Sequence, residues 1–186
     1  MNGGMADKTA LAGERVDETG LRSFSESIAI WHGMAEITFL CIGTDRSTGD
    51  CLGPLVGTML AERGVPNVVG TLKEPCDSER LPRLLPELAE AGAIFAVDAC
   101  LGRPEHVGGY VVRRGPLVPA QSVGRGFGPI GDYSVAAVVN AVSPKPYWTL
   151  QSTSLYGVMG MARAIADAIC DGFGHERQSQ SGEEEV

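Results

Sequence analysis

The sequence predicts an α/β protein in which helices cover both faces of a mostly parallel sheet. From Ile37 onward, short β-rich runs alternate with segments of helical periodicity. That alternation is typical of βαβ units, whose parallel strands are connected through helices. The run AIFAVD at 93–98 is apolar until its final acid, as in a strand buried on both faces. We therefore expect a three-layer α/β/α architecture.

The length of 186 residues is that of a single domain. Residues 1–35 mix glycine, charges and isolated apolar positions, and we expect an N-terminal extension that is partly ordered at most. Residues 36–173 are expected to form one domain, and residues 174–186 a disordered acidic tail. A domain of that size buries about two-thirds of its unfolded surface, so no metal or disulfide is needed for stability.

Composition excludes several classes of function. The formal charge of −8 argues against a nucleic-acid partner, which would require clustered lysine and arginine. No apolar run approaches the length of a membrane span, and no signal peptide opens the chain. The five cysteines include no C-x-x-C pair. We expect a reduced cytoplasmic protein with no membrane partner.

The first half of the domain reads as strand, helix, strand, helix. A strand over 37–42 precedes a helix over 52–60 with one apolar face. A short strand is expected over 68–72. Ser78 then resembles the cap of a second helix, whose leucines recur at i, i+3, i+4 and i+7 until Gly92 ends the pattern.

The second half opens with the strand over 93–98 and a weaker, edge-like strand over 107–115. The segment 115–131 is rich in Gly and Pro, and loops of this length are usually functional or mobile. Asp132 is expected to cap a helix that extends to residue 142. A short strand over 147–150 and a strongly periodic helix from residue 152 or 153 to 169 complete the pattern.

Two acids follow strands of the predicted sheet. Asp50 lies in the loop after the first strand, and Asp98 ends the AIFAVD strand. Active sites of such folds lie beyond the carboxyl ends of the strands. Two carboxylates about 4 Å apart repel by about 4 kcal/mol, or about three pKa units, and would share a proton. The pair could activate water and protonate a leaving amine, or it could hold a divalent metal; no other cofactor is expected.

Simpler interpretations exist for the polar residues of these loops. Asp50 can be a helix cap, whereas a buried charge at Asp98 is costly without partners, which favours a functional role for Asp98. Asp45 and Arg46 can form an exposed local ion pair, and Asp132 can be a cap. Asp45 and Asp132 are also expected to support the catalytic pair. No well-placed histidine is evident to activate Cys51 or Cys100, and the histidines show no zinc spacing.

The loop GTDRSTGD at 43–50 resembles a phosphate cradle only in its glycines. It is neither G-x-G-x-x-G nor G-x-x-x-x-G-K-[ST], and it places two acids where a phosphate would sit. We expect it instead to support catalysis. Backbone N–H groups of Gly43, Thr44 and Gly49 are the candidates to stabilise an oxyanion.

Several longer motifs carry a family resemblance. They are CIGTDRSTGDCLGPLVGT (41–58), GTLKEP (70–75), AVDACLG (96–102), GPL (115–117), GDYSVAAVVN (131–140), and LQSTSL with VMGMA (150–162). In order and spacing they closely resemble the sporulation protease YyaC family, from about residue 37 to 168. That family is similar to the germination protease of spores and, more remotely, to the hydrogenase maturation endopeptidases.

The resemblance implies a phosphorylase/hydrolase-like fold and an endopeptidase of aspartic type. In the germination protease the two aspartates stand in D-x-L-G-P and D-A, which match Asp50 in DCLGP and Asp98 in DACLG. The implied substrate is a protein or peptide, such as a spore protein, in the sporulating cell or forespore. Corresponding acids of the hydrogenase endopeptidases bind metal together with a histidine. YyaC relatives carry a histidine where this chain reads PCDSERL.

Two other functions are compatible with the sequence. The same acids could serve a metal-binding hydrolase. Alternatively, the chain could be a catalytically silent sporulation protein that binds a partner through the loop 115–131.

Overall fold

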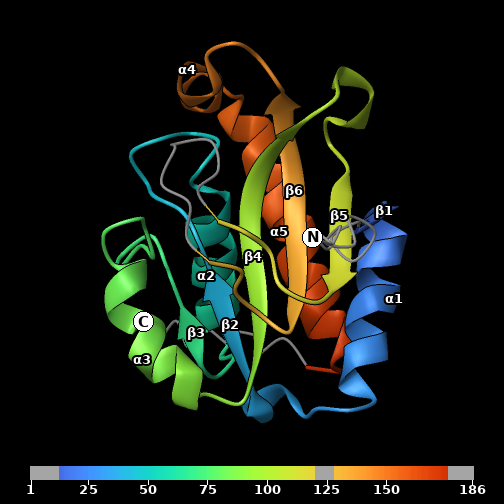
Figure 1. The fold of residues 1–186 in the computed structure, drawn as a ribbon. Coiled ribbons are helices and arrows are strands. Elements are labelled where there is room, and N and C mark those ends of the chain that lie inside the picture. Colours follow the sequence, from blue (N-terminus) through green and yellow to red (C-terminus); the bar gives the residue numbers. More distant parts are fainter. Residues whose placement is uncertain (1–12, 120–127, 176–186) are drawn as a thin grey trace, which may run out of the picture.

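The computed structural model describes residues 13–119 and 128–175 as a six-stranded sheet between helices (Figure 1). The strand order is β1-β5-β6-β4-β2-β3. The strands are β1 (Glu14–Val16), β2 (Ile37–Cys41), β3 (Val68–Val69), β4 (Ala93–Gly102), β5 (Tyr110–Arg114) and β6 (Tyr133–Ala141). The helices are α1 (Glu18–Ala29), α2 (Leu52–Glu62), α3 (Leu81–Glu90), α4 (Pro146–Gln151) and α5 (Leu155–Gly172), with short 3-10 turns η2 (Met34–Glu36) and η3 (Pro104–His106).

The predicted α/β architecture is confirmed. β3, β2, β4 and β6 run parallel to one another, while β5 pairs antiparallel with β6 and β1 pairs antiparallel with β5. Alternate residues of β2 and β4 enter different cores. Phe39 and Phe95 pack with α1, α2 and α5 on one face. Leu40 and Ala96 pack with α3 and the segments at Leu117 and Ile130 on the other.

The segment before residue 36 belongs to the domain, so the predicted boundary is wrong. β1 pairs with β5, and α1 packs against α5. Leu21 and Ile28 of α1 are fully buried. Asp17 caps this helix by accepting a 2.9 Å hydrogen bond from the Gly20 N–H. β1 has only three residues, and a single amphipathic helix follows it. This sequence pattern is too short to predict that the segment joins the domain. β1, rather than β5, is therefore the edge strand.

Two elements of the second half have the opposite type from the one expected. Residues 133–141 form strand β6. Both faces of this strand are largely buried, so its apolar residues do not alternate with polar ones, and the spacing of its valines resembles one face of a helix. Their β-branched side chains suit a central strand. Residues 146–151 form α4, with Pro146 in its first turn, where proline is tolerated. The final helix begins at Leu155, slightly later than expected, with Ser154 as its cap.

Two predicted segments lie partly outside the described residues. The loop 115–131 is described only at its two ends, where Leu117 and Ile130 pair. Most of the predicted tail, from residue 176, is not among the described residues. Within the described ranges, no helix combines the length and apolarity that crossing a membrane requires.

Helix α2 lies unusually close to the sheet because two of its residues lack side chains. A Cβ on Gly53 would collide with the carbonyl oxygen of Ile42, and one on Gly57 would collide with that of Gly70. The backbone of α2 therefore rests directly on the chain that leaves β2 and β3. This contact fixes the position of the loop that connects β2 to α2.

We predict that Gly57→Ala destabilises the protein by about 1–3 kcal/mol, because the backbone it meets cannot move aside cheaply. Gly160→Ala in α5 is the matched control, because apart from the adjacent backbone of α5 itself nothing described lies within 4 Å of its Cβ position. That control should be neutral, or stabilising by up to about 1 kcal/mol. Urea unfolding of both variants measures the difference. Equal effects would contradict the close-packing account.

Candidate active site

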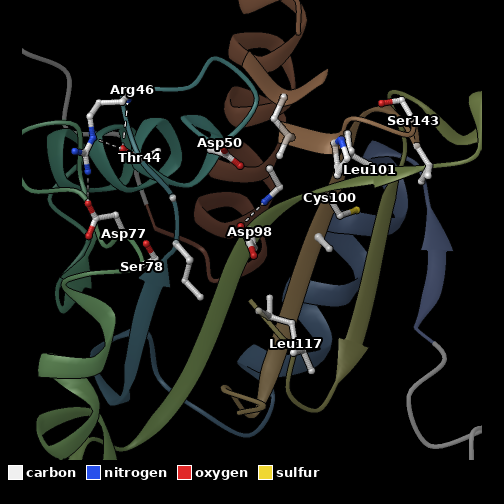
Figure 2. Close-up of a pocket in the computed structure, with 18 residues that line it drawn as sticks. Thr44, Arg46, Asp50, Asp77, Ser78, Asp98, Cys100, Leu101, Leu117 and Ser143 are labelled. Carbon is white, nitrogen blue, oxygen red and sulfur yellow. Dashed lines mark hydrogen bonds and ion pairs between the residues drawn. The ribbon is translucent and has the colours of Figure 1, made fainter. Parts of the chain in front are cut away.

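A pocket of about 480 Å³ opens at the carboxyl ends of β2 and β4, and Asp50 and Asp98 both line it. Its walls come from the loop after β2, the turn before α3, the end of β4, and the segment leading into α4. Figure 2 shows the two carboxylates facing the same hollow. The structure thus brings together the two acids that the sequence singled out.

Asp98 reaches the pocket because β4 extends beyond its neighbour. The last pair between β2 and β4 is Cys41 with Val97, so Asp98 is the first residue of β4 past the end of β2. On the other side, β4 still pairs with β6, where Asp98 faces Ala136. The Asp98 Oδ1 accepts a 2.8 Å hydrogen bond from the Ala99 N–H. A hydrogen bond of this kind favours the ionised carboxylate.

Asp50 is half-buried at the start of α2. Burial raises the pKa of its carboxyl above the ordinary value, and the nearby Ser47 hydroxyl opposes that shift. The Ser47 Oγ is itself buried and makes no hydrogen bond of regular geometry with a described residue. Cys51 is the N-cap of α2, and no described side chain accepts a capping hydrogen bond there. The interpretation of Asp50 as a cap is therefore wrong, and its side chain faces the pocket instead.

The loop from Gly43 to Asp50 folds back on itself. Gly43 has φ of 147°, a conformation that favours glycine, and a Cβ there would collide with the Asp50 carbonyl oxygen. The Thr44 N–H donates to that same oxygen at 3.1 Å. The Gly43 N–H donates to the carbonyl of Cys76 at 3.0 Å, and the Gly49 N–H to that of Leu150 at 2.8 Å. These three amides are held within the protein, which removes them as oxyanion donors in this conformation.

The predicted supporting residues divide into two groups. Gly43 and Thr44 line the pocket. Asp45 is exposed and does not line it, while Gly49 packs against Leu150. Asp132 lies at the opposite end of β4, where it accepts a 2.8 Å hydrogen bond from the Ile94 N–H. It precedes a strand instead of capping a helix, so the expected cap is absent and the residue cannot support the pair directly.

Sequence reasoning missed an ion pair at one end of the pocket. Arg46 contacts Asp77 at 2.7 Å, so it has no need of the expected local partner Asp45. Its Nε also donates to the Thr44 Oγ1 at 3.3 Å. Although burial opposes it, the N–H groups of Arg80 and Glu79 and the Arg46 guanidinium lower the pKa of Asp77. Asp77, and not Ser78, accepts the N–H groups that precede α3.

The far wall of the pocket is apolar, and its residues were given no role from the sequence alone. They are Leu101, Leu117, Val142, Pro146 and Leu150. Ser143 marks this end of the hollow in Figure 2, opposite Arg46 and Asp77. The available signal was that Leu117 and Val142 follow strands, which identifies the correct edge of the sheet but no individual side chain.

The cysteines near the acids are poor nucleophiles. Burial, together with the charge of Asp98, raises the pKa of the Cys100 thiol to about 12. Burial also raises the pKa of Cys51, whose Sγ donates to the Thr48 carbonyl. Both thiols keep their protons at neutral pH, and the thiolate is the form that attacks. This agrees with the sequence, in which no histidine was placed to activate them.

The donor set for a metal ion is small. No three His, Cys, Asp or Glu residues in the described part of the chain are grouped to hold one. His32 bonds to the Tyr133 hydroxyl, and His175 to the Arg63 carbonyl. His106 lies in η3, beside another cavity. Of the three carboxylates that line this pocket, Asp77 already pairs with Arg46, which leaves Asp50 and Asp98 as the better candidates to hold a divalent ion.

Comparison with known proteins identifies relatives of the chain. Residues 14–168 match the model of the family described as Protein of unknown function (DUF1256). A relative from Bacillus subtilis (strain 168), described as Uncharacterized protein YyaC, is 38% identical over 138 residues. The match covers 72% of this chain and 67% of the relative. No solved structure matches the chain. The family match includes both pocket acids and, from residue 14, the β1 and α1 elements.

Asp50→Asn is expected to stabilise the protein near neutral pH. A raised pKa in the folded state means that stability is fully present below the unfolded value near 3.8 and is lost as pH rises through the folded value. Asparagine resembles the protonated acid and escapes that loss. We expect a gain of about 0.5–2 kcal/mol at pH 7 to 8 that vanishes below about pH 4.

Denaturant unfolding across that pH range measures the effect. Asp45→Asn, in the same loop but exposed, is the matched control and should change stability by less than about 0.5 kcal/mol at every pH. A variant at Asp50 that is less stable than the parent at pH 8 would show that the carboxylate is stabilised, not penalised, in this pocket.

Proposed function

The chain belongs to the DUF1256 family, and we propose that it is an endopeptidase in which Asp50 and Asp98 act on one water molecule. The observation that carries this proposal is the shared pocket of two acids, one with its pKa raised by burial. Enzymes that use two carboxylates commonly hold them in environments that separate their proton affinities. The match of DCLGP and DACLG to the germination protease motifs supports a peptide bond as the target.

The two acids would have different roles. Asp98, with its hydrogen bond from the Ala99 N–H, would be the ionised base that takes a proton from water. The resulting hydroxide adds to the scissile carbonyl carbon. Protonated Asp50 then gives its proton to the amide nitrogen as the C–N bond breaks. The proton held by Asp98 returns to Asp50, directly or through water, and restores the starting state.

The pocket walls suit a polypeptide substrate. Side chains such as Leu101, Leu117 and Leu150 offer an apolar surface beside the acids, and Arg46 and Asp77 offer polar contacts at the other end. Desolvation by these walls strengthens electrostatic effects at the reacting bond. We propose that the substrate is a protein present in the cytoplasm of the sporulating cell or forespore, an assignment that rests on the YyaC-like motifs.

Asp50→Asn and Asp98→Asn should each reduce cleavage by at least about 100-fold, the usual contribution of a general acid or base. The purified protein would be incubated with small acid-soluble spore proteins, and fragments followed by mass spectrometry. Glu62→Gln is the control for loss of one charge, because Glu62 is exposed at the far end of α2. Its cleavage rate should equal that of the parent.

Identical fragments from the parent and from Asp98→Asn would refute the proposal. A divalent-metal series separates the metal-dependent alternative: cleavage that requires the ion, with binding lost in both aspartate variants, would assign the acids to metal binding. No cleavage under any condition, together with an unchanged sporulation phenotype in both variants, would favour a binding protein.

A further inference from the structure

Large apolar side chains are exposed on the segment that follows β6, on α4 and on the first turns of α5. Eleven large hydrophobic side chains are exposed in the described ranges, and six of them belong to residues between 142 and 159. Trp148 is 64% exposed and Tyr156 is 91% exposed. We call the six the aromatic rim: Val142, Tyr147, Trp148, Leu155, Tyr156 and Met159. Exposed apolar clusters on soluble domains commonly mark interaction surfaces.

The aromatic rim is continuous with the candidate active site. Val142 belongs to both, and Pro146 and Leu150 of α4 line the pocket while Tyr147 and Trp148 of the same short helix are exposed. α4 lies beyond the carboxyl end of β6 (Figure 1), which is the edge of the sheet where the pocket opens. A chain that enters the pocket and continues past α4 would meet these aromatic side chains.

Two side chains of the rim, Tyr147 and Trp148, are held in place by their neighbours. The rings of Tyr147 and Trp148 meet edge to face, with centroids 5.9 Å apart. The Tyr147 hydroxyl accepts a 2.7 Å hydrogen bond from Gln151 Nε2. Aromatic side chains ordered before binding lose little conformational entropy when a ligand covers them. Such residues are the usual anchors of protein interfaces.

Charge distinguishes among the partners that could cover the rim. Three acids and one arginine line the adjoining pocket, and the whole chain carries −8. A second copy would carry the same charge, and an anionic membrane surface would also be repelled. An extended polypeptide with apolar side chains and no acidic residues would not be repelled by this negative charge.

We propose that the aromatic rim binds an extended, apolar, non-acidic segment of the protein substrate, next to the peptide bond held between Asp50 and Asp98. This inference rests on the proposed function and names its substrate class. Selectivity would come from apolar residues several positions away from the cleaved bond. Binding to the rim, unlike cleavage, does not require the catalytic acids.

The two tryptophans of the chain allow a direct test. In full-length Asp98→Asn protein carrying Trp31→Phe, Trp148 is the single tryptophan. The ligand is a synthetic peptide of about twelve residues, with alternating leucine and serine and two lysines. Binding of this peptide should shift the fluorescence emission of Trp148 to the blue. The matched protein carries Trp148→Phe instead and retains Trp31, which lies in the turn after α1 and does not line the pocket. The emission of that protein should not change. A control peptide with serine in place of every leucine should bind neither of these two protein variants.

Tyr156→Ser should weaken peptide binding about tenfold or more, because removal of an interface anchor typically costs that much. At 91% exposure, this side chain contributes little to the fold, and unchanged urea unfolding verifies that. In the active protein, the same variant should raise KM and leave kcat unchanged.

The possible failures are distinguishable. Cleavage with an unchanged KM in Tyr156→Ser overturns the rim proposal and leaves the peptidase intact. Peptide binding at Trp148 without any cleavage supports the rim and refutes the proposed reaction. A blue shift that appears with protein concentration alone, or with neutral lipid vesicles and not with the peptide, overturns the proposal in favour of self-association or membrane contact.

Discussion

The difference in length between two neighbouring strands determines where the pocket of this protein forms. β4 continues past the last residue of β2, and Asp98 lies in the part of β4 that has no partner on the β2 side. The chain that leaves β2 then turns at Gly43, and α2 rests on the sheet through Gly53 and Gly57. These close contacts place Asp50 in the same pocket as Asp98. The pocket is therefore a consequence of strand register and backbone packing, and its two acids come from opposite sides of one parallel pair.

The electrostatics of the site differ from the simplest expectation for paired acids. Repulsion between carboxylates was expected to raise one pKa, yet burial is the leading cause of the shift at Asp50. Asp98 is stabilised by a backbone N–H, and its charge is felt by neighbouring thiols. The two carboxyl groups therefore lie in different environments, one governed by burial and the other by a hydrogen bond from the backbone. Such a pair resembles the unequal acids of many hydrolases.

The sequence predicted the sheet and both pocket acids because those features follow from local pattern. The buried strand 93–98 and the loop after β2 were visible as an apolar run and a glycine-rich motif. β6 was mistaken for a helix because a strand buried on both faces does not alternate. The Arg46–Asp77 pair joins residues 31 positions apart, and only the tertiary fold reveals it. The apolar wall is equally non-local.

The edges of the sheet limit how a polypeptide could be held. β1 has three residues and β3 has two, so neither offers a long row of unpaired backbone groups. Many peptide-binding proteins recruit their ligand as an additional strand, with affinity from main-chain hydrogen bonds. The short edge strands of this protein offer few main-chain groups for binding of that kind. Recognition would depend on side chains at the loop edge, so N-methylation of a bound peptide's backbone would be tolerated better than replacement of its bulky residues.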